Sequence, residues 1–255
     1  MRFHKYHAAG NDFIVTDEPT VGPADAPRLC DRRTGIGADG LLLHRAAERG
    51  DARMIVVNAD GSVAEMCGNG LRCFCRYLIE QQGVTKKRLS VETGAGPIEC
   101  LVNRDGDRWA VTVDLGAATL KEPAGTDIWR VDIGNPHLVV RGPTDEARAR
   151  EEAVRIQREH RGGVNVEMVL SLDREHRTAE ILVNERGAGF TRACGTGGGA
   201  VVAALSHAGI VSIGEEWSLR FPGGVIRYRI TPERRILMTG DAQFVFSGAT
   251  DAPAR

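Results

Sequence analysis

The sequence has few aromatic residues and almost no net charge. Aromatic side chains make up 5% of the 255 residues, and the formal net charge is −1. A near-neutral chain lacks the basic surface of a general nucleic-acid binder or a polybasic membrane anchor. No apolar run approaches the ~20 residues needed to cross a bilayer. The opening MRFHKYHAAGNDFIV also lacks the apolar core of a signal peptide. We therefore expect a cytoplasmic protein that binds neither nucleic acid nor membrane.

Residue patterns for metal and cofactor binding are also missing. The six cysteines form no CxxC pair and have no downstream HxxxH, so we expect thiols rather than a zinc site. A pyridoxal Schiff base needs a lysine in a motif-bearing site. GAGFTRACGTGGG lacks the G-K-[ST] ending of a phosphate loop. No glycine-rich motif contains any of the lysines, which are Lys5, Lys86, Lys87 and Lys121. We therefore expect no metal and no cofactor.

Glycine is abundant, with 31 residues, which indicates many turns. Short β-like runs such as RMIVVN, RWAVTVDLG and VIRYRI are separated by Gly, Asp, Asn and Pro. Three stretches are typical of helices: 70–82, 197–208 and 144–160, the last with Thr144 as its N-cap. Strands outnumber helices and do not alternate with them, which argues against a doubly wound parallel sheet.

Three motifs occur twice, in the same order and about half a chain apart. GNDFIV is echoed by GNPHLVV, VNADG by VNERG, and EMCGNG by RACGTG. Three echoes at nearly the same offset indicate two homologous halves. The junction falls near 113–125, where turn residues and a proline gather.

Each half places a cysteine directly before a glycine turn that opens a helix. A helix N-terminus carries unpaired N–H groups and about half a positive charge. It therefore binds anions and lowers a thiol pKa from ~8.5 toward ~3.5–7.5. Two such turns, at Cys67 and Cys194, could hold one carboxylate with a sulfur on either side of the attached carbon. This pattern predicts racemisation or epimerisation, with the carbanion stabilised by fixed dipoles.

Seven ordered motifs then identify a resemblance: GNDFIV, DRRTGIGADGLLL, NADGSVAEMCGNGLRC, GNPHLVV, GGVNVEMV, NERGAGFTRACGTG and RILMTGDAQFVFSG. Together they resemble the diaminopimelate epimerases over nearly the whole chain. The resemblance implies an α+β fold of two pseudo-symmetric domains, each a curled, mostly antiparallel, barrel-like sheet around a central helix. It places the first domain at residues 1–115, to which the C-terminal segment 241–255 returns, and the second domain at residues 116–240. It also implies a homodimer.

The resemblance further implies cofactor-independent interconversion of LL- and meso-diaminopimelate, in lysine and peptidoglycan precursor biosynthesis. Its substrate is a small diamino dicarboxylate. The acid/base pair would be Cys67 and Cys194. The residues implied to bind substrate are Asn11, Gly40, Asn58, Gly68, Asn69, Asn135, Asn165, Glu185, Arg186, Gly195 and Thr196. Among them, Asn11 and Asn135 would hold the reacting amino group. Asn58, Asn165, Glu185 and Arg186 would grip the distal end, while His137 and Glu185 would tune the cysteine pKa values.

The chemistry of these residues also fits independently, since Glu185-Arg186 offers a carboxylate for an ammonium and a guanidinium for a carboxylate. Three positions depart from the family pattern. Gly40 stands where many members have Gln, Asn184 where an aromatic is usual, and Phe190 where Glu is common. These departures keep two alternatives open: a related racemase, for instance of histidine type, and a non-catalytic amino-acid-binding protein on the same fold. Proline racemases are disfavoured by Asn69, where His is expected.

Overall fold

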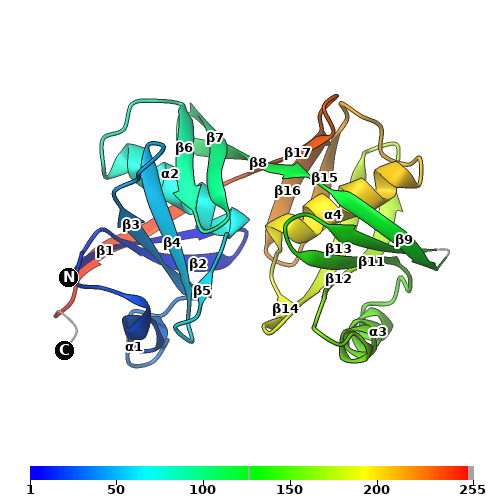
Figure 1. The fold of residues 1–255 in the computed structure, drawn as a ribbon, viewed down its shortest axis with the longest axis horizontal. Coiled ribbons are helices and arrows are strands. Elements are labelled where there is room, and N and C mark those ends of the chain that lie inside the picture. The colour runs from blue at the N-terminus through cyan, green and yellow to red at the C-terminus, as the bar shows by residue number, and fades with distance from the viewer. Residues whose placement is uncertain (126, 252–255) are drawn as a thin grey trace. The chain divides into compact units, whose positions relative to one another are not determined.

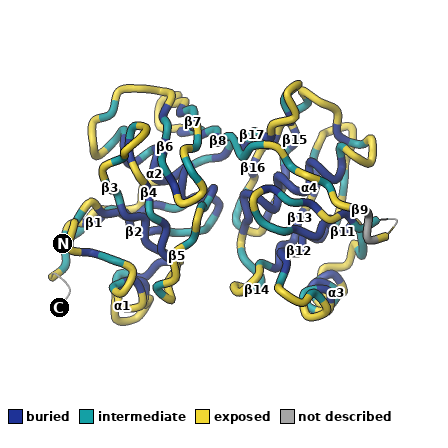
Figure 2. The backbone as a smooth tube through the Cα atoms, in the orientation of Figure 1, coloured by how far each residue is buried: buried dark blue, intermediate teal, exposed yellow. Residues whose placement is uncertain are grey.

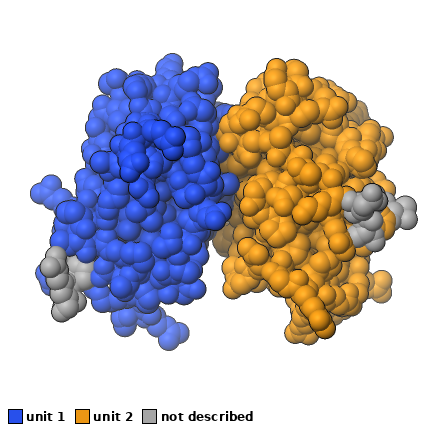
Figure 3. All heavy atoms as spheres, in the orientation of Figure 1, with its two compact units in different colours: residues 1–113, 240–255 blue, residues 114–239 orange. Residues whose placement is uncertain are grey.

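The computed structural model describes residues 1–125 and 127–251. The chain forms two compact units (Figure 3). Unit 1 comprises Met1–Val113 and Gly240–Arg255, and unit 2 comprises Asp114–Thr239. The chain passes into unit 2 within the strand Arg108–Ala117 and returns to unit 1 at the end of the strand Arg235–Gly240. Among the described residues, no helix is long and apolar enough to cross a membrane.

Unit 1 is a curled sheet with helix α2 (Gly68–Glu80) packed against it (Figure 1). A short 3-10 helix (Pro23–Asp25) and α1 (Ala26–Cys30) connect its second and third strands. Neighbouring strands are antiparallel, except that β2–β3 and β4–β6 are parallel. The strands are β1 (Arg2–Ala8), β2 (Asn11–Thr16), β3 (Gly40–Arg45), β4 (Ala52–Asn58), β5 (Val63–Ala64), β6 (Arg88–Thr93), β7 (Gly96–Asp105), β8 (Arg108–Ala117) and β18 (Gln243–Ala249).

Unit 2 repeats this arrangement, with α3 (Glu146–Glu159) after its third strand and α4 (Gly195–His207) packed on its sheet. The parallel pairs are now β11–β12 and β13–β15. The other pairs of neighbouring strands are antiparallel. The strands are β9 (Thr119–Gly125), β10 (Ile128–Asp132), β11 (Pro136–Arg141), β12 (Asn165–Asp173), β13 (Thr178–Glu185), β14 (Gly189–Thr191), β15 (Glu216–Phe221), β16 (Gly224–Ile230) and β17 (Arg235–Gly240).

The two units therefore share one connectivity, in which strands β10 to β17 repeat the pairing of β1 to β8. The last strand of each repeat pairs with the first strand of the other repeat. β18, from the end of the second repeat, pairs with β1 in unit 1, and β9, from the end of the first, pairs with β10 in unit 2. The predicted fold class, two repeated and curled α+β domains with mostly antiparallel sheets, is confirmed.

The predicted helices are present, with differences at their ends. Helices α2 and α4 begin directly after Cys67 and Cys194, whose extended backbones and sulfur atoms serve as N-caps. The expectation that Thr144 caps the third helix is wrong. Asp145 is the N-cap of α3, and its carboxylate accepts the Arg148 N–H at 3.0 Å. A carboxylate at this position also interacts favourably with the helix dipole.

Small residues allow α4 to lie deep in unit 2. Its residues from Gly195 to Leu205 are all buried, and Figure 2 shows the helix as dark tube. Glycines 197–199 make room for the unit's own side chains. A Cβ at Gly198 would lie 2.3 Å from the Tyr228 hydroxyl, and one at Gly199 would lie 2.9 Å from Ile133. The Tyr228 hydroxyl in turn donates to the Gly195 carbonyl at 3.0 Å.

Candidate active site

The first cysteine turn lies at the N-terminus of α2 in unit 1. Cys67 is half-buried, and its sulfur accepts the Gly70 N–H at 3.4 Å. The same sulfur lies 3.9 Å from Oδ1 of Asn11. Asn69 is buried, and its Nδ2 donates to Oδ1 of Asn11 at 3.5 Å. The structure thus brings together Cys67, Gly68, Asn69 and Asn11 around one helix N-terminus.

Asn11 is held by a charged cluster that the sequence analysis did not assign. Its Nδ2 donates to Oδ2 of Asp39 at 2.9 Å. Arg32 bridges Asp39, at 2.8 Å, and Asp12, at 2.6 Å, while the buried Lys5 pairs with Asp12 at 2.6 Å. Burial alone would raise the pKa of Asp12, but the hydrogen bonds from Arg32 and Lys5 outweigh it and hold that pKa well below its usual range. The motif DRRTGIGADG was the available signal for this cluster.

The second cysteine turn, in unit 2, is more deeply enclosed. Cys194 is buried, and its sulfur accepts the Gly197 N–H at 3.4 Å and lies 3.5 Å from the Thr196 hydroxyl. Burial raises the pKa of the Cys194 thiol well above its ordinary value, and the charges of Glu185 and Glu167 raise it further. The Thr196 hydroxyl and the Gly197 N–H lower it, but by less. The expectation of a lowered pKa is therefore wrong for Cys194, because burial and two carboxylates outweigh the helix N-terminus.

Glu185, at the end of β13, is a candidate proton acceptor for Cys194, because the two side chains interact. Burial raises the pKa of Glu185, and the largest opposing influences are hydrogen bonds from Thr191 and Cys194. The Thr191 hydroxyl donates to Oε1 of Glu185 at 2.5 Å. A carboxylate with a raised pKa beside a thiol with a raised pKa is suited to exchanging a proton with it.

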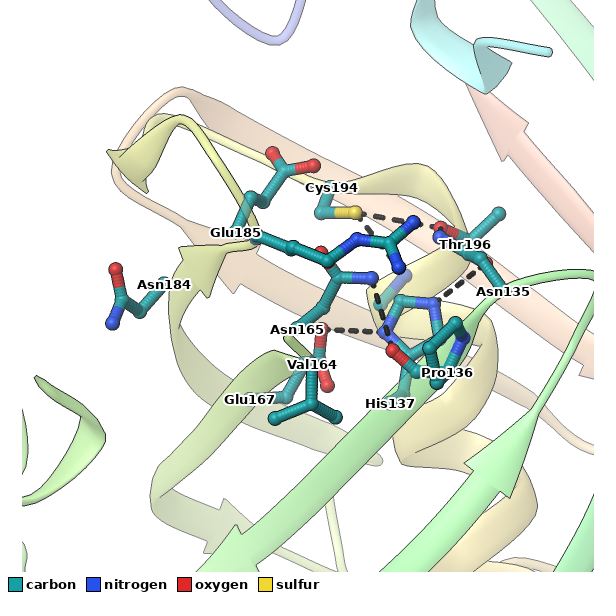
Figure 4. A network of polar contacts seen from close by, with 12 residues as sticks. Asn135, Pro136, His137, Val164, Asn165, Glu167, Asn184, Glu185, Cys194 and Thr196 are labelled. Atoms are coloured by element: carbon teal, nitrogen blue, oxygen red, sulfur yellow. Dashed lines mark hydrogen bonds and ion pairs between the residues drawn. The ribbon is translucent and has the colours of Figure 1, made fainter. Parts of the chain in front are cut away.

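A buried polar chain lies beside this turn (Figure 4). Nδ1 of His137 is 2.8 Å from Oε1 of Glu167, and Nε2 of His137 is 2.9 Å from Oδ1 of Asn135. Nδ2 of Asn135 then donates to the Thr196 hydroxyl at 3.4 Å. The structure brings the predicted residues Asn135, His137, Gly195 and Thr196 together near Cys194. Glu167 was not predicted, because alternation in NVEMV is also typical of an ordinary strand.

The residues predicted to grip a distal group have different surroundings. Asn165 is buried and both ends of its amide are engaged: Nδ2 donates to the Pro136 carbonyl at 3.1 Å, and Oδ1 accepts the Arg186 N–H at 2.9 Å. Asn58 is exposed and donates to the Ser62 hydroxyl at 2.9 Å within its turn. Arg186 is exposed, and its guanidinium forms no ion pair with any residue that the structure describes.

Gly40, one of the three departures, is closed to side chains. A Cβ there would lie 2.6 Å from the Val57 carbonyl oxygen, so a longer residue requires the backbone to move. Because Gly40 has no side chain, it cannot supply the amide contact that glutamine would make.

The other two departures, Asn184 and Phe190, lie on the α3 side of unit 2. They pair across β13 and β14. From α3, Gln157 donates to the Asn184 carbonyl at 3.2 Å, and Arg150 lies 4.6 Å from the Phe190 ring centroid. Figure 4 shows the Asn184 side chain pointing away from Cys194. The structure therefore gives neither residue a direct contact with the cysteine turn.

Neither cysteine turn has the ligands of a metal centre. In the parts of the chain that are described, no group of three or more His, Cys, Asp or Glu side chains could hold a metal ion. All six cysteines are free thiols.

By fold, the chain is similar to solved two-domain structures to which it has little sequence identity. A solved structure from Agrobacterium radiobacter, described as a probable proline racemase with bound carbonate, superposes with a TM-score of 0.77 at 15% identity, covering 98% of this chain and 92% of that one. The diaminopimelate epimerase family model matches residues 3–121 and 130–245. The diaminopimelate epimerases of Carboxydothermus hydrogenoformans and Ectopseudomonas mendocina are 36% and 37% identical, each match covering 97% of this chain and 98% of the relative. The chain belongs to the diaminopimelate epimerase family.

Proposed function

We propose that this protein is a cofactor-independent isomerase that interconverts LL- and meso-diaminopimelate. The observation that carries the proposal is the repeated cysteine turn: in each unit a cysteine caps a glycine-opened helix, in a chain that belongs to this family. The curated relatives from Carboxydothermus hydrogenoformans, Ectopseudomonas mendocina and Synechocystis, matched over nearly their whole length, have the name diaminopimelate epimerase, so the histidine-type racemase and the non-catalytic binder are not favoured.

The reaction follows from the chemistry of the two turns. One thiolate removes the α-proton, and the electron pair of the broken C–H bond passes into the carboxylate, where helix N–H groups stabilise the charge. The other thiol donates its proton to the opposite face of the carbon and becomes the thiolate. No redox step is needed, and the reverse direction restores the first state. The raised pKa of Cys194 favours its thiol form, which can donate a proton in one direction of the reaction, and Glu185 can accept that proton when Cys194 acts as the base in the other direction.

The decisive experiment is proton exchange in D₂O. We expect NMR to show deuterium entering the α-position of diaminopimelate, with the inverted stereoisomer appearing. A panel of other amino acids, including histidine and proline, should exchange much more slowly. Binding of diaminopimelate without exchange would support the non-catalytic alternative, and faster exchange of another amino acid would support a related racemase.

We propose that Arg186 binds the distal carboxylate of the substrate. Arg186→Met is expected to lower kcat/KM for diaminopimelate by about tenfold for each ~1.4 kcal/mol lost, because a charge-assisted hydrogen bond contributes ~1.5–3 kcal/mol. Slow exchange of a small amino acid that lacks this carboxylate should change little. The exposed Arg229 on β16 offers a matched control, Arg229→Met, which should behave as wild type. Unchanged kcat/KM for diaminopimelate in Arg186→Met would show that Arg186 does not bind the distal carboxylate.

We also propose a cytoplasmic homodimer active in lysine and peptidoglycan precursor biosynthesis, with catalytic domains at 1–115 plus 241–255 and at 116–240. Exposed apolar side chains on β18 support the dimer: Phe244, Val245 and Phe246 are 38%, 50% and 43% exposed. Phe246→Lys is expected to shift the mass measured by light scattering from dimer to monomer. Ile213→Lys, at another exposed apolar position, should leave the mass unchanged.

A further inference from the structure

Glu167 and His137 form a fully buried acid–imidazole pair under the Cys194 turn. Both side chains are 0% exposed, and Oε2 of Glu167 has no hydrogen-bond partner among the described residues. Such a pair is costly to bury, because the desolvation of two polar groups is only partly repaid by their attraction. Its presence therefore calls for a role beyond packing.

The hydrogen bonds of His137 restrict where its protons lie. Oδ1 of Asn135 is a carbonyl oxygen and only accepts, so Nε2 of His137, at 2.9 Å, must bear a hydrogen. Glu167 satisfies Nδ1 in either of two ways: as a carboxylate accepting from an imidazolium, or as an acid donating to a neutral ring. In both states Nε2 stays protonated. The amide of Asn135 is then held with Nδ2 toward Thr196, whose hydroxyl lies 3.5 Å from the Cys194 sulfur.

Unit 1 shows that the cysteine turn folds without this pair. His137 is in register with Asn165 across β11–β12, as Phe13 is with Gly40 across β2–β3. Two residues further along each of β12 and β3, Glu167 corresponds to Leu42. The two side chains fill the same place: a Cβ on Gly197 would lie 2.6 Å from Oε1 of Glu167, and one on Gly70 would lie 3.0 Å from Cδ2 of Leu42.

The side-chain amides of Asn11 in unit 1 and Asn135 in unit 2 are held in opposite orientations relative to their cysteine turns. In unit 1, Nδ2 of Asn11 is engaged by the Asp39 carboxylate, so Oδ1 faces Asn69 and Cys67. In unit 2, Oδ1 of Asn135 is engaged by His137, so Nδ2 faces Thr196. Unit 1 therefore offers a hydrogen-bond acceptor beside its cysteine, and unit 2 offers a donor. An ammonium group requires an acceptor, whereas a carboxylate requires a donor.

We propose that Glu167 is a positioning residue that acts through His137 to hold Asn135 with its amide N–H toward Thr196 and the Cys194 turn. This inference rests on the proposed function for its kinetic consequence. It makes Asn11 and Asn135 chemically distinct and replaces the expectation that both hold the reacting amino group: Asn11 accepts from the substrate ammonium, and Asn135 donates to a substrate oxygen. Unit 2 thus has the polar pair Glu167–His137 where unit 1 has the apolar residues Leu42 and Phe13.

The first test needs no turnover. In ¹⁵N-labelled protein, the imidazole spectrum should show Nε2 of His137 protonated across neutral pH, with the signal assigned by its absence in His137→Gln. An unprotonated Nε2 in the wild type would overturn the proposal, whatever the activity of the enzyme. Because this measurement reads the ring directly, it separates failure of this inference from failure of the proposed function.

The second test replaces residues of unit 2 by the residues that unit 1 has at the equivalent positions. Glu167→Leu copies Leu42, and the double variant His137→Phe/Glu167→Leu copies the whole apolar pair. The double variant should melt at or above the wild-type temperature, since a buried polar pair is replaced by apolar groups that the fold accepts. Glu167→Leu alone should melt lower, because it leaves Nδ1 of the buried His137 without its partner. Both should lose at least tenfold in kcat/KM for diaminopimelate. Glu167→Gln should retain activity within about threefold, because its amide N–H can still donate to Nδ1. Wild-type turnover in a folded Glu167→Leu variant, or equal losses in Gln and Leu variants, would contradict a positioning role.

Discussion

Replacing Cys67 or Cys194 by alanine is expected to reduce epimerisation by at least about 10³-fold, because each removes one of the two proton-transfer groups. The fold should survive. Each sulfur accepts one N–H at 3.4 Å as a helix N-cap, and loss of a cap costs about 1 kcal/mol. Turnover is measured by α-proton exchange in D₂O, and folding by circular dichroism and thermal melting.

Serine supplies the matched control for these variants. Cys67→Ser and Cys194→Ser restore a strong N-cap and should melt close to the wild-type temperature. They should remain severely impaired, because a hydroxyl is a far weaker base near neutral pH than a thiolate. Near-wild-type turnover in a serine variant would show that the cysteines cap their helices and do not transfer protons.

Replacing Glu185 by glutamine is expected to change two observables in opposite directions. Epimerisation should fall by about 10²-fold or more, because the carboxylate beside Cys194 can no longer accept its proton. Alkylation of Cys194 at a given pH should become faster. The charge of Glu185 raises the pKa of Cys194, so removing that charge lowers this pKa and increases the thiolate fraction.

Alkylation is followed by mass spectrometry of the Cys194 peptide across pH, in a Cys67→Ser background. The midpoint should move to lower pH in Glu185→Gln. Glu180→Gln provides the control, since Glu180 lies on the same strand but is exposed. An unmoved midpoint would mean that Cys194 does not sense the Glu185 carboxylate.

Local patterns were sufficient to predict much of this fold. The Cys-Gly turns marked the starts of α2 and α4, because a cap and its glycines lie within a few residues of one another. The repeated motifs predicted two similar units. Thr144 was chosen over Asp145 as the cap of α3, since adjacent residues of similar cap preference cannot be separated without the backbone angles.

Non-local packing could not be predicted in the same way. The high pKa of Cys194 depends on burial and on two carboxylates from β12 and β13, which the turn sequence does not contain. The strand sequence around Glu167 does not distinguish this residue from an ordinary strand residue. Its proposed role depends on its contact with His137 and on its equivalence to Leu42, and both require the structure. The placement of Asn184 and Phe190 toward α3 likewise follows from strand pairing.

The exchanged strands β9 and β18 have a consequence for biosynthesis of the chain. β1 is synthesised before every other strand described and its partner β18 after all of them, and the Met1 amino group reaches the Thr250 carbonyl at 2.6 Å. Unit 1 therefore begins to form first but cannot be completed until β18 has been synthesised, whereas β9 precedes its partner β10 directly. A gene divided between β9 and β10 would encode two fragments, each lacking one strand of its unit's sheet. During synthesis, the uncovered edge of β1 is the site most exposed to pairing with another nascent chain.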